Sequence, residues 1–149
     1  MTSSREPATV LVVDDDRDSR EIAALLVERA GYRARRAESG AECLRIVESE
    51  PIDLVLLDVM MPGMDGFAVC AALHAKGWRL PVILLTARDD TDTRLESMHH
   101  GVSEFLTKPI NRHELFARVR AQLHIVELAR QLDEVEDGLR LPADPPARP

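Results

Sequence analysis

Residues 54–66 read LVLLDVMMPGMDG, an aliphatic run that ends at Asp58 and is followed by a turn. Such a run predicts a strand buried on both faces, which is typical of the middle of a parallel sheet. Asp65 is suited to cap a following helix, and Gly63 and Gly66 are expected where the turn needs a permissive backbone. The stretch therefore predicts one βα unit with a polar residue at the carboxyl end of its strand.

The same alternation of strand and helix continues on both sides of this stretch. Strands are predicted over residues 9–13, 32–37, 53–57, 81–85 and 104–107. Helical patterns separate these strands. The first carries Ile22, Leu25, Leu26 and Ala30 and ends at Gly31, and the second is capped by Ser39, with Glu42 completing a capping box. A later helix covers about residues 90–100, and the last helix begins at Asn111. Five such units predict an α/β fold in which helices cover a parallel sheet.

The second predicted strand differs from the others because Arg33, Arg35 and Arg36 interrupt it. Charges of this kind discourage edge-to-edge pairing, so the strand is expected at an edge of the sheet. We interpret its arginines as a solvated edge and not as a nucleic-acid patch.

Composition narrows the class of protein. The chain has 149 residues, 45% apolar and 30% charged, which predicts one soluble globular domain. A formal net charge of −7 argues against direct binding of nucleic acid. No apolar run resembles a signal segment or a membrane span, so a cytoplasmic location without a membrane partner is expected. Cys43 and Cys70 lie in apolar helical patterns and are expected to be buried free thiols.

Acidic residues follow two of the predicted strands. Asp14, Asp15 and Asp16 follow the first strand, and Asp58 follows the third. Ligands of open parallel sheets bind beyond the carboxyl ends of the strands, so Asp14, Asp15 and Asp58 converge there if the two strands are neighbours. Close carboxylates repel one another and need a cation, and an all-oxygen ligand set suits Mg²⁺.

Two more strand ends carry groups that phosphoryl transfer requires. Thr86 offers a hydroxyl and Lys108 offers a positive charge, and together with a metal they would neutralise phosphoryl oxygens. Asp58 is the best placed nucleophile. The alternative is that the acids only cap helices, which is common for a single acid after a strand. That alternative leaves the recurrence of acid, hydroxyl and lysine at strand ends without a reason.

Four segments together resemble the response-regulator receiver family. They are VLVVDDD at 10–16, LVLLDVMMPGMDG at 54–66, ILLTA at 83–87 and FLTKP at 105–109. The resemblance covers about residues 8–125. It implies a doubly wound, flavodoxin-like five-stranded sheet in the order 2-1-3-4-5, here with an extended C-terminal helix.

The resemblance also implies roles for individual residues. Asp58 matches the phosphoacceptor, Asp15 a direct ligand of Mg²⁺, and Asp14 a ligand acting largely through water. The backbone carbonyl of Met60 matches the third protein ligand. Asp16 matches no essential position and is interpreted as a helix cap.

The switch of the family also has counterparts in this chain. Thr86 matches the switch hydroxyl, Lys108 the lysine that pairs with the phosphoryl group, and Phe105 the switch aromatic, where tyrosine is commoner. The peptide bond from Lys108 to Pro109 is expected to be cis. Met60 and Arg88 border the approach of hydrolytic water, and neither is suited to orient it, so a comparatively long-lived phosphoprotein is expected.

The last predicted helix is longer than a sheet needs. Leu115, Val119 and Leu123 can pack on the domain, and a seam then repeats at spacings of 3, 4, 3 and 4 through Ile125, Leu128, Leu132, Val135 and Leu139. The seam favours a parallel homodimer, although Gly138 weakens it, and the alternative is a helix that folds back on the domain. The expected division is an N-terminal arm at 1–8, a receiver at 9–125, a helical extension at 126–140 and a proline-rich tail at 141–149.

The function that these patterns favour is a signalling switch. A histidine kinase would phosphorylate Asp58, and the face made by the 90–100 helix, the last strand and the last helix would change its affinity for a downstream effector or for a second copy. Enzymatic activity would be limited to the chain's own phosphorylation and dephosphorylation. The alternatives are a phosphorylation-independent docking module, or a Mg²⁺-dependent phosphatase, which would need a second acid where Met60 stands.

The five histidines are scattered and are interpreted as surface side chains: His74, His99, His100, His113 and His124.

The segment 108–123, KPINRHELFARVRAQL, resembles receivers that precede cyclic-di-GMP cyclase or phosphodiesterase domains, but no such domain occurs in this sequence. Either an excised receiver or a stand-alone regulator is consistent with that. The sequence names neither the cognate kinase nor the downstream effector.

Overall fold

The computed structural model describes residues 7–87 and 102–140 of the chain. Its strands are β1 Thr9–Val13, β2 Arg33–Ala37, β3 Leu54–Asp58, β4 Val82–Ala87 and β5 Glu104–Lys108. Its helices are α1 Arg17–Arg29, α2 Gly40–Ser49, α3 Gly66–Ala75 and α5 Arg112–Arg140. The predicted helix at 90–100, Arg88, the tail at 141–149 and most of the N-terminal arm lie outside the described residues.

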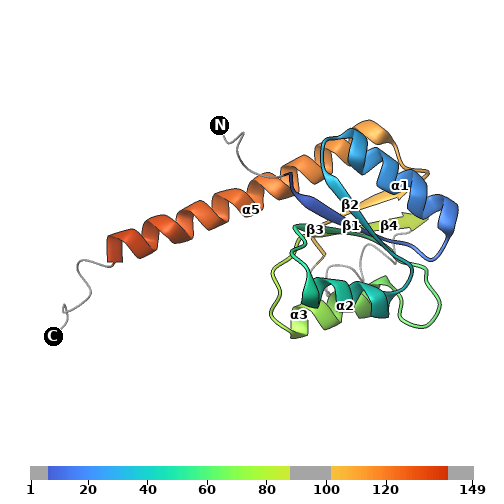
Figure 1. Cartoon of the computed structure of the whole chain (residues 1–149), viewed down its shortest axis with the longest axis horizontal. Helices are drawn as coiled ribbons and strands as arrows, with labels where there is room; N and C mark the ends of the chain where they lie inside the picture. The colour runs from blue at the N-terminus through green and yellow to red at the C-terminus, as the bar shows by residue number, and fades with distance from the viewer. Residues whose placement is uncertain (1–6, 88–101, 141–149) are drawn as a thin grey trace.

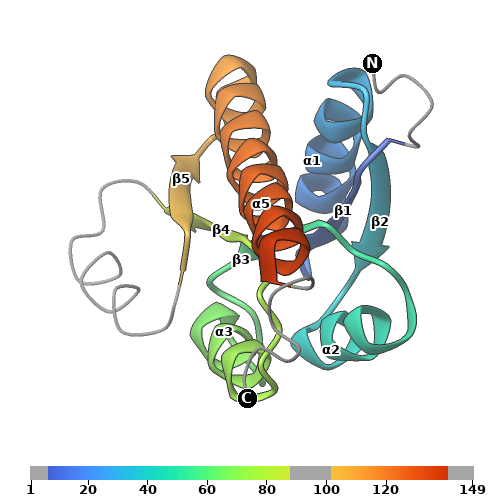
Figure 2. The same ribbon diagram turned by 90° about the vertical axis from the view of Figure 1, so that its left-hand side faces the viewer.

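The strands form one parallel sheet in the order β2-β1-β3-β4-β5, which confirms the doubly wound, flavodoxin-like arrangement. Helices α1 and α5 cover one face of the sheet, and α2 and α3 cover the other (Figures 1 and 2). From β1 the chain adds β2 on one side of the sheet and then β3, β4 and β5 on the other, so the direction of strand addition reverses between β1 and β3. This is the point at which open α/β sheets bind ligands.

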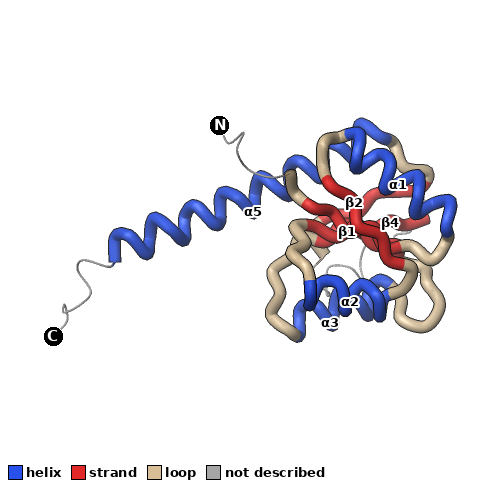
Figure 3. The backbone as a smooth tube through the Cα atoms, in the orientation of Figure 1, coloured by secondary structure: helices blue, strands red, loops and turns tan. Residues whose placement is uncertain are grey.

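The core consists of two apolar layers, one on each face of the sheet. Figure 3 shows the sheet lying between the two groups of helices. Strand β3 is buried along its whole length, and β1 and β4 are buried over most of theirs. Their side chains alternate between the two layers, so that Leu57 and Leu84 contribute to one and Leu56 and Leu85 to the other. The aliphatic runs of the sequence therefore mark the central strands, as predicted.

Helix α1 is present where predicted, and the side chains that it buries most deeply are small. Ala23, Ala24 and Val27 are buried, whereas Ile22 is 58% exposed and Leu25 is 47% exposed. Small side chains let the helix axis approach the sheet closely, and this close approach turns the larger side chains outward. Ile22 and Leu25, which mark this helix in the sequence, therefore do not contribute to its buried face.

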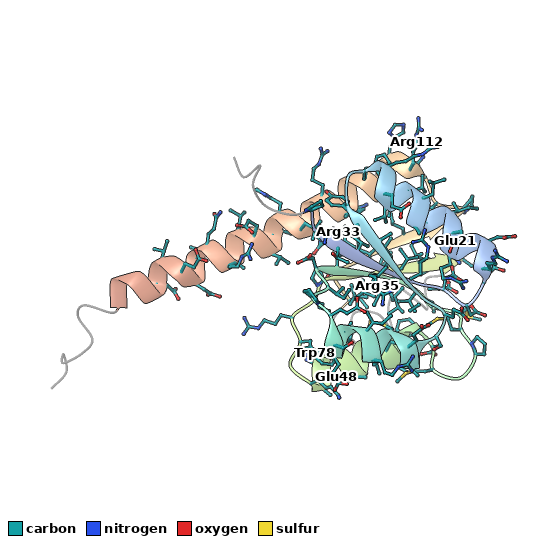
Figure 4. The ribbon with its side chains drawn as sticks, in the orientation of Figure 1. Glu21, Arg33, Arg35, Glu48, Trp78 and Arg112 are labelled. Carbon is teal, nitrogen blue, oxygen red and sulfur yellow. The ribbon has the colours of Figure 1, made fainter. Side chains whose placement is uncertain are left out.

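Strand β2 lies at the edge of the sheet, as its arginines predicted. Those arginines are more than a solvated edge, because Arg35 and Arg36 pair with acids of the two helical layers. Figure 4 labels Arg35 on this strand and Glu21 on α1. Arg35 makes two side-chain hydrogen bonds to Glu50, at 2.7 and 2.6 Å, and Arg36 pairs with Glu21 on α1. These ion pairs tie the edge strand to both helical layers.

Each helix with a described start is capped by a side chain that accepts a hydrogen bond from a backbone N–H. The caps are Asp16, Ser39, Asp65 and Asn111. The first of these confirms the reading of Asp16 as a cap. Glu42 differs slightly from the predicted capping box, since its carboxylate accepts from the N–H of Glu38, one residue before the cap.

Helix α5 is continuous over 29 residues. Leu115 and Val119 are buried against the sheet and Leu123 is half-buried, as predicted, and an ion pair between Arg118 and Glu104 ties the helix to β5. Beyond this segment α5 extends away from the domain (Figure 1), so it does not fold back. Among the helices of the described ranges, none is long and apolar enough to cross a membrane.

Candidate functional site

Four polar side chains meet at the carboxyl edge of the sheet because four neighbouring strands end there. Asp58 is the last residue of β3, Lys108 is the last of β5, and Thr86 is the penultimate residue of β4. Asp14 follows β1 directly. The strand ends lie one residue later than predicted for β3 and β5 and two later for β4, because the ladder pairs Asp58 with Leu85, Thr86 with Thr107 and Ala87 with Lys108.

Asp14, Asp15 and Asp58 form an acidic cluster. One carboxylate oxygen from each lies within 4.8 Å of the others. Asp14 and Asp58 are buried, at 1% and 6% exposure, whereas Asp15 is exposed. The predicted convergence of the three carboxylates is therefore present, with one open side through which a ligand can reach them.

The side chain of Lys108 lies between two of these acids. Its Nζ is 3.1 Å from Asp58 Oδ1 and 3.2 Å from Asp14 Oδ2. The cluster of three carboxylates thus contains a single ammonium, which contacts two of them, and this leaves a formal excess of negative charge at the site. Excess charge in a partly buried place favours a further cation.

The two partners respond to this environment in the same direction. The pKa of Asp58 is raised, first by burial and then by the neighbouring Asp14 and Asp15, and Lys108 only partly opposes the increase. Burial acts to lower the pKa of Lys108, but Asp58 and Asp14 outweigh it, so that the lysine pKa is raised. Lys108 is therefore held as a cation, but its charge does not fully offset the burial of Asp58 and the neighbouring acids.

Asp14 is fixed by its backbone and by its neighbours. Its Oδ1 accepts a hydrogen bond from the N–H of Asp16 at 2.9 Å, and its carbonyl accepts one from Arg20 at 3.1 Å. Its own N–H donates to the carbonyl of Ala37 on β2. No sequence pattern indicated the contribution of Arg20, which comes from the first turn of α1.

Thr86 and Phe105 lie on adjacent strands at the β4–β5 side of the site. Thr86 is 3% exposed, and its hydroxyl donates to the carbonyl of Leu106 on β5 at 3.5 Å. Phe105 is half-buried and packs against the apolar layer shared with α2 and α3. The two predicted switch residues are therefore linked through β5.

The loop after β3 is shaped by its glycines and leaves Met60 accessible, with its side chain 74% exposed. Gly63 has a φ of +77°, as expected of a turn glycine. Gly66 has no positive φ, so the prediction of a permissive turn is wrong there. Instead, a Cβ at Gly66 would lie 2.9 Å from the carbonyl oxygen of Asp58 and from Cα of Val59. The absence of a side chain lets α3 begin directly against the strand end that carries Asp58.

The peptide bond from Lys108 to Pro109 is cis, as predicted. Beside it lies an open, largely apolar groove of about 510 Å³. Its lining is formed by Ser19, Ile22, Ala87, Lys108, Pro109 and Ile110. No sequence pattern indicated this groove, because its lining comes from separate segments of the chain.

Comparisons with known proteins agree with this geometry. The sequence model described as "Response regulator receiver domain" matches residues 10–120. Response regulator MprA of Mycolicibacterium vanbaalenii is 43% identical over 117 residues, which are 78% of this chain and 51% of that protein. Response regulator MprA of Mycobacterium ulcerans is 39% identical over 132 residues, covering 89% and 56%. The chain thus spans about half the length of these curated relatives.

Solved structures give the same result. The receiver domain of the Francisella response regulator 1452 superposes with a TM-score of 0.75 at 31% identity, covering 80% of this chain and 98% of that one. The Vibrio cholerae chemotaxis protein CheY4 superposes with a TM-score of 0.73 at 28% identity, covering 77% and 98%.

Proposed function

This chain belongs to the response-regulator receiver family, and from that premise we propose that Asp58 accepts a phosphoryl group from a histidine kinase in a Mg²⁺-dependent reaction. As a receiver of the two-component type, the chain is a signalling protein and not a conventional enzyme. The observation that carries the proposal is the position of Asp58 at the end of β3, in contact with Lys108 and in one cluster with Asp14 and Asp15. Asp14 has similar neighbours, but it is more deeply buried, at 1% exposure against 6%, and its Oδ1 already accepts a hydrogen bond from the N–H of Asp16.

The acidic cluster fits a magnesium ion. Asp15 and Asp58 would ligate it directly, Asp14 largely through water, and the carbonyl of Met60 would complete the protein ligands. All of these donors are oxygen atoms, which Mg²⁺ prefers, and the open side at Asp15 leaves room for water and phosphoryl oxygens. When bound, the ion supplies positive charge that neutralises the carboxylates and the phosphoryl oxygens.

The transfer itself would be carried by the residues of the strand ends. A carboxylate oxygen of Asp58 attacks the phosphorus, and the bond from phosphorus to the histidine nitrogen of the donor breaks. Lys108 then exchanges its contact with Asp58 Oδ1 for a phosphoryl oxygen, which is a small movement from 3.1 Å. The Thr86 hydroxyl can exchange its long bond to Leu106 for a charged acceptor, since 3.5 Å is at the limit of a hydrogen bond.

The output would pass through the β5–α5 side of the molecule, together with the segment before β5. Movement of Thr86 frees space beside Phe105, which is only half-buried and can turn inward. The consequence would be a changed affinity for an effector or for a second copy of the chain. We expect these partners in the cytoplasm, without direct binding of DNA by this domain.

The groove beside Lys108 suits the docking of the kinase. It lies next to the site, and the exposed Ile22 offers apolar contact area near the residues that receive the phosphoryl group. A docking module without phosphorylation would need neither the buried Asp58 nor its lysine. A small-substrate phosphatase is disfavoured because Met60 stands where a second catalytic acid would be needed.

The proposal is tested by incubating the whole chain with acetyl phosphate and Mg²⁺ and measuring its intact mass. Wild type should gain one phosphoryl group, and Asp58→Asn should gain none, because the amide cannot act as the nucleophile. Asp53→Asn is a matched control, since Asp53 lies at the opposite end of β3. Equal labelling of wild type and Asp58→Asn would overturn the assignment.

A further inference from the structure

We infer that the part of α5 beyond the domain pairs with the same segment of a second copy in a parallel, in-register coiled coil. The pairing segment is residues 125–139, called the seam helix here. This inference names one partner of the proposed switch. It rests on the proposed function only for its consequence in signalling, because the pairing itself needs no phosphoryl group.

The seam helix presents a row of large apolar side chains that nothing in the described residues covers. Ile125 is 55% exposed, Leu128 47%, Leu132 64% and Val135 56%. Side chains of this size are seldom exposed in a continuous row on a monomer, whereas they commonly mark a protein contact. The row begins where α5 leaves the sheet, directly after Leu123, which is half-buried.

The spacing of the row selects the kind of partner. Its residues follow one another at intervals of 3, 4 and 3, and Leu139 continues the pattern in the sequence after an interval of 4. A repeat of this kind keeps a narrow apolar stripe on one side of a helix, which suits another helix of the same repeat better than a broad sheet surface. The seam helix is therefore complementary to a copy of itself.

Charges on the seam helix are placed so that two copies can approach. In a parallel pair the positions beside the seam are His124, Ala129, Gln131, Glu136 and Gly138, of which only Glu136 carries a formal charge with histidine neutral. Across the pair, Gln131 would face Glu136 of the second copy, so an amide meets a carboxylate and no like charges oppose each other. Most of the charged residues, Glu127, Arg130, Asp133 and Glu134 among them, occupy the outer positions.

The inner half of α5 fixes the direction of the seam helix. Leu115 and Val119 are buried, and Arg118 pairs with Glu104 on β5, so the helix starts from a rigid base. Figure 1 shows the same helix continuing outward without a break. A parallel pair would therefore hold both receivers at one end and lead both chains out at the other.

Sedimentation velocity over a range of protein concentrations tests whether the seam helix pairs. Wild type should change from monomer to dimer as its concentration rises, because a seam of about two heptads is short. Leu132→Glu should weaken the dimer at least about tenfold, since it places two carboxylates opposite each other in the seam. Glu134→Lys, on the outer side of the same helix, should change the dimer constant by less than about threefold. Both residues are exposed, so neither change removes a buried contact of the monomer.

Disulfide trapping tests the direction of the pair. Val135→Cys should form a disulfide between identical positions, and Glu134→Cys should not, because only position 135 faces its counterpart in a parallel pair. The native thiols will not interfere, since Cys43 and Cys70 are buried and burial raises the pKa of each to about 12. An antiparallel pair would instead join Leu128→Cys to Leu132→Cys.

The inference is overturned if wild type stays monomeric at every concentration, if Leu132→Glu and Glu134→Lys behave alike, or if the antiparallel disulfide forms. Performing these measurements on Asp58→Asn separates them from the proposed function. A dimer in that variant supports the pairing whether or not Asp58 is the phosphoacceptor.

Discussion

At the scale of single residues, the site depends on an imbalance of charge around Asp58. Burial is the largest cause of the raised pKa of Asp58, and the ammonium of Lys108 does not fully offset burial and the neighbouring acids. A carboxylate in this state gains from any added cation, which is the physical basis for expecting metal to promote its chemistry. Asp14 directly follows β1 and Asp58 ends β3, so the two sheet strands hold these acids close together. The excess of negative charge is therefore a consequence of the fold.

Two adjacent acids of the same loop allow a sharp test of the metal site. Asp15→Asn should weaken Mg²⁺ binding by more than about tenfold, or about 1.4 kcal/mol, because it removes a direct charged ligand. Asp16→Asn removes the same charge one residue later, but Asp16 caps α1 and an amide oxygen can keep that cap. Its effect should stay below about threefold, the size expected of a screened charge nearby. Isothermal titration calorimetry measures both, and equal losses would contradict the ligand assignment.

At the scale of elements, sequence patterns were most informative where burial is uniform. The central strands are aliphatic throughout, and polar residues occur at their ends, so β1, β3 and β4 and the residues of the site could be placed from sequence. The helix caps could also be predicted from the sequence, because a cap is a local interaction between residues three positions apart. The resemblance of four short segments to one family then supplied the strand order.

Other element-scale features depend on tertiary contacts that a linear pattern does not contain. The apolar pattern of α1 predicted the helix but not its packing face: Ile22 and Leu25 are exposed, while Ala23 and Ala24 are buried against the sheet. The groove beside Lys108 was not predicted either, because its lining comes from separate segments of the chain. The pairing of Arg35 with Glu50 joins residues 15 positions apart and could not be read from spacing.

That ion pair predicts a pH-dependent contribution to stability. Hydrogen bonds from Arg35 lower the pKa of Glu50 below its usual value of 4.5. A lowered carboxyl pKa stabilises the fold above the unfolded pKa, and this contribution is lost as the pH falls through the folded value. Glu50→Gln should therefore lower the urea midpoint slightly at neutral pH, and the difference from wild type should close as the medium is acidified below pH 4.5.

Glu48→Gln is the matched control for this prediction. Glu48 lies in the last turn of α2, two residues before Glu50, and makes a single exposed contact with Lys76 at 3.3 Å. Its effect at neutral pH should be smaller than that of Glu50→Gln, because exposed single contacts contribute little. A gap between wild type and Glu50→Gln that persists unchanged in acid would show that the ion pair is not its cause.

At the scale of the whole molecule, the proposed phosphorylation site and the seam helix lie at opposite ends of the domain. Helix α5 connects them, since it begins three residues after Pro109 and runs beside the sheet to its far end (Figures 1 and 2). A change at Lys108 or Phe105 therefore acts directly on the strand and loop that lead into α5. The sequence indicated the length of this helix and its heptad spacing, but only the structure shows that the helix leaves the domain and exposes its apolar row.

The function proposed for this molecule depends on Asp58 as the phosphoacceptor of a Mg²⁺-dependent site. The most direct measurement is to phosphorylate the whole chain with acetyl phosphate, reduce the acyl phosphate with borohydride and locate the resulting homoserine by peptide mass spectrometry. Homoserine is expected at position 58 when Mg²⁺ is present, and almost none when the metal is chelated. Homoserine at another aspartate, or equal yield at position 58 without Mg²⁺, would contradict it.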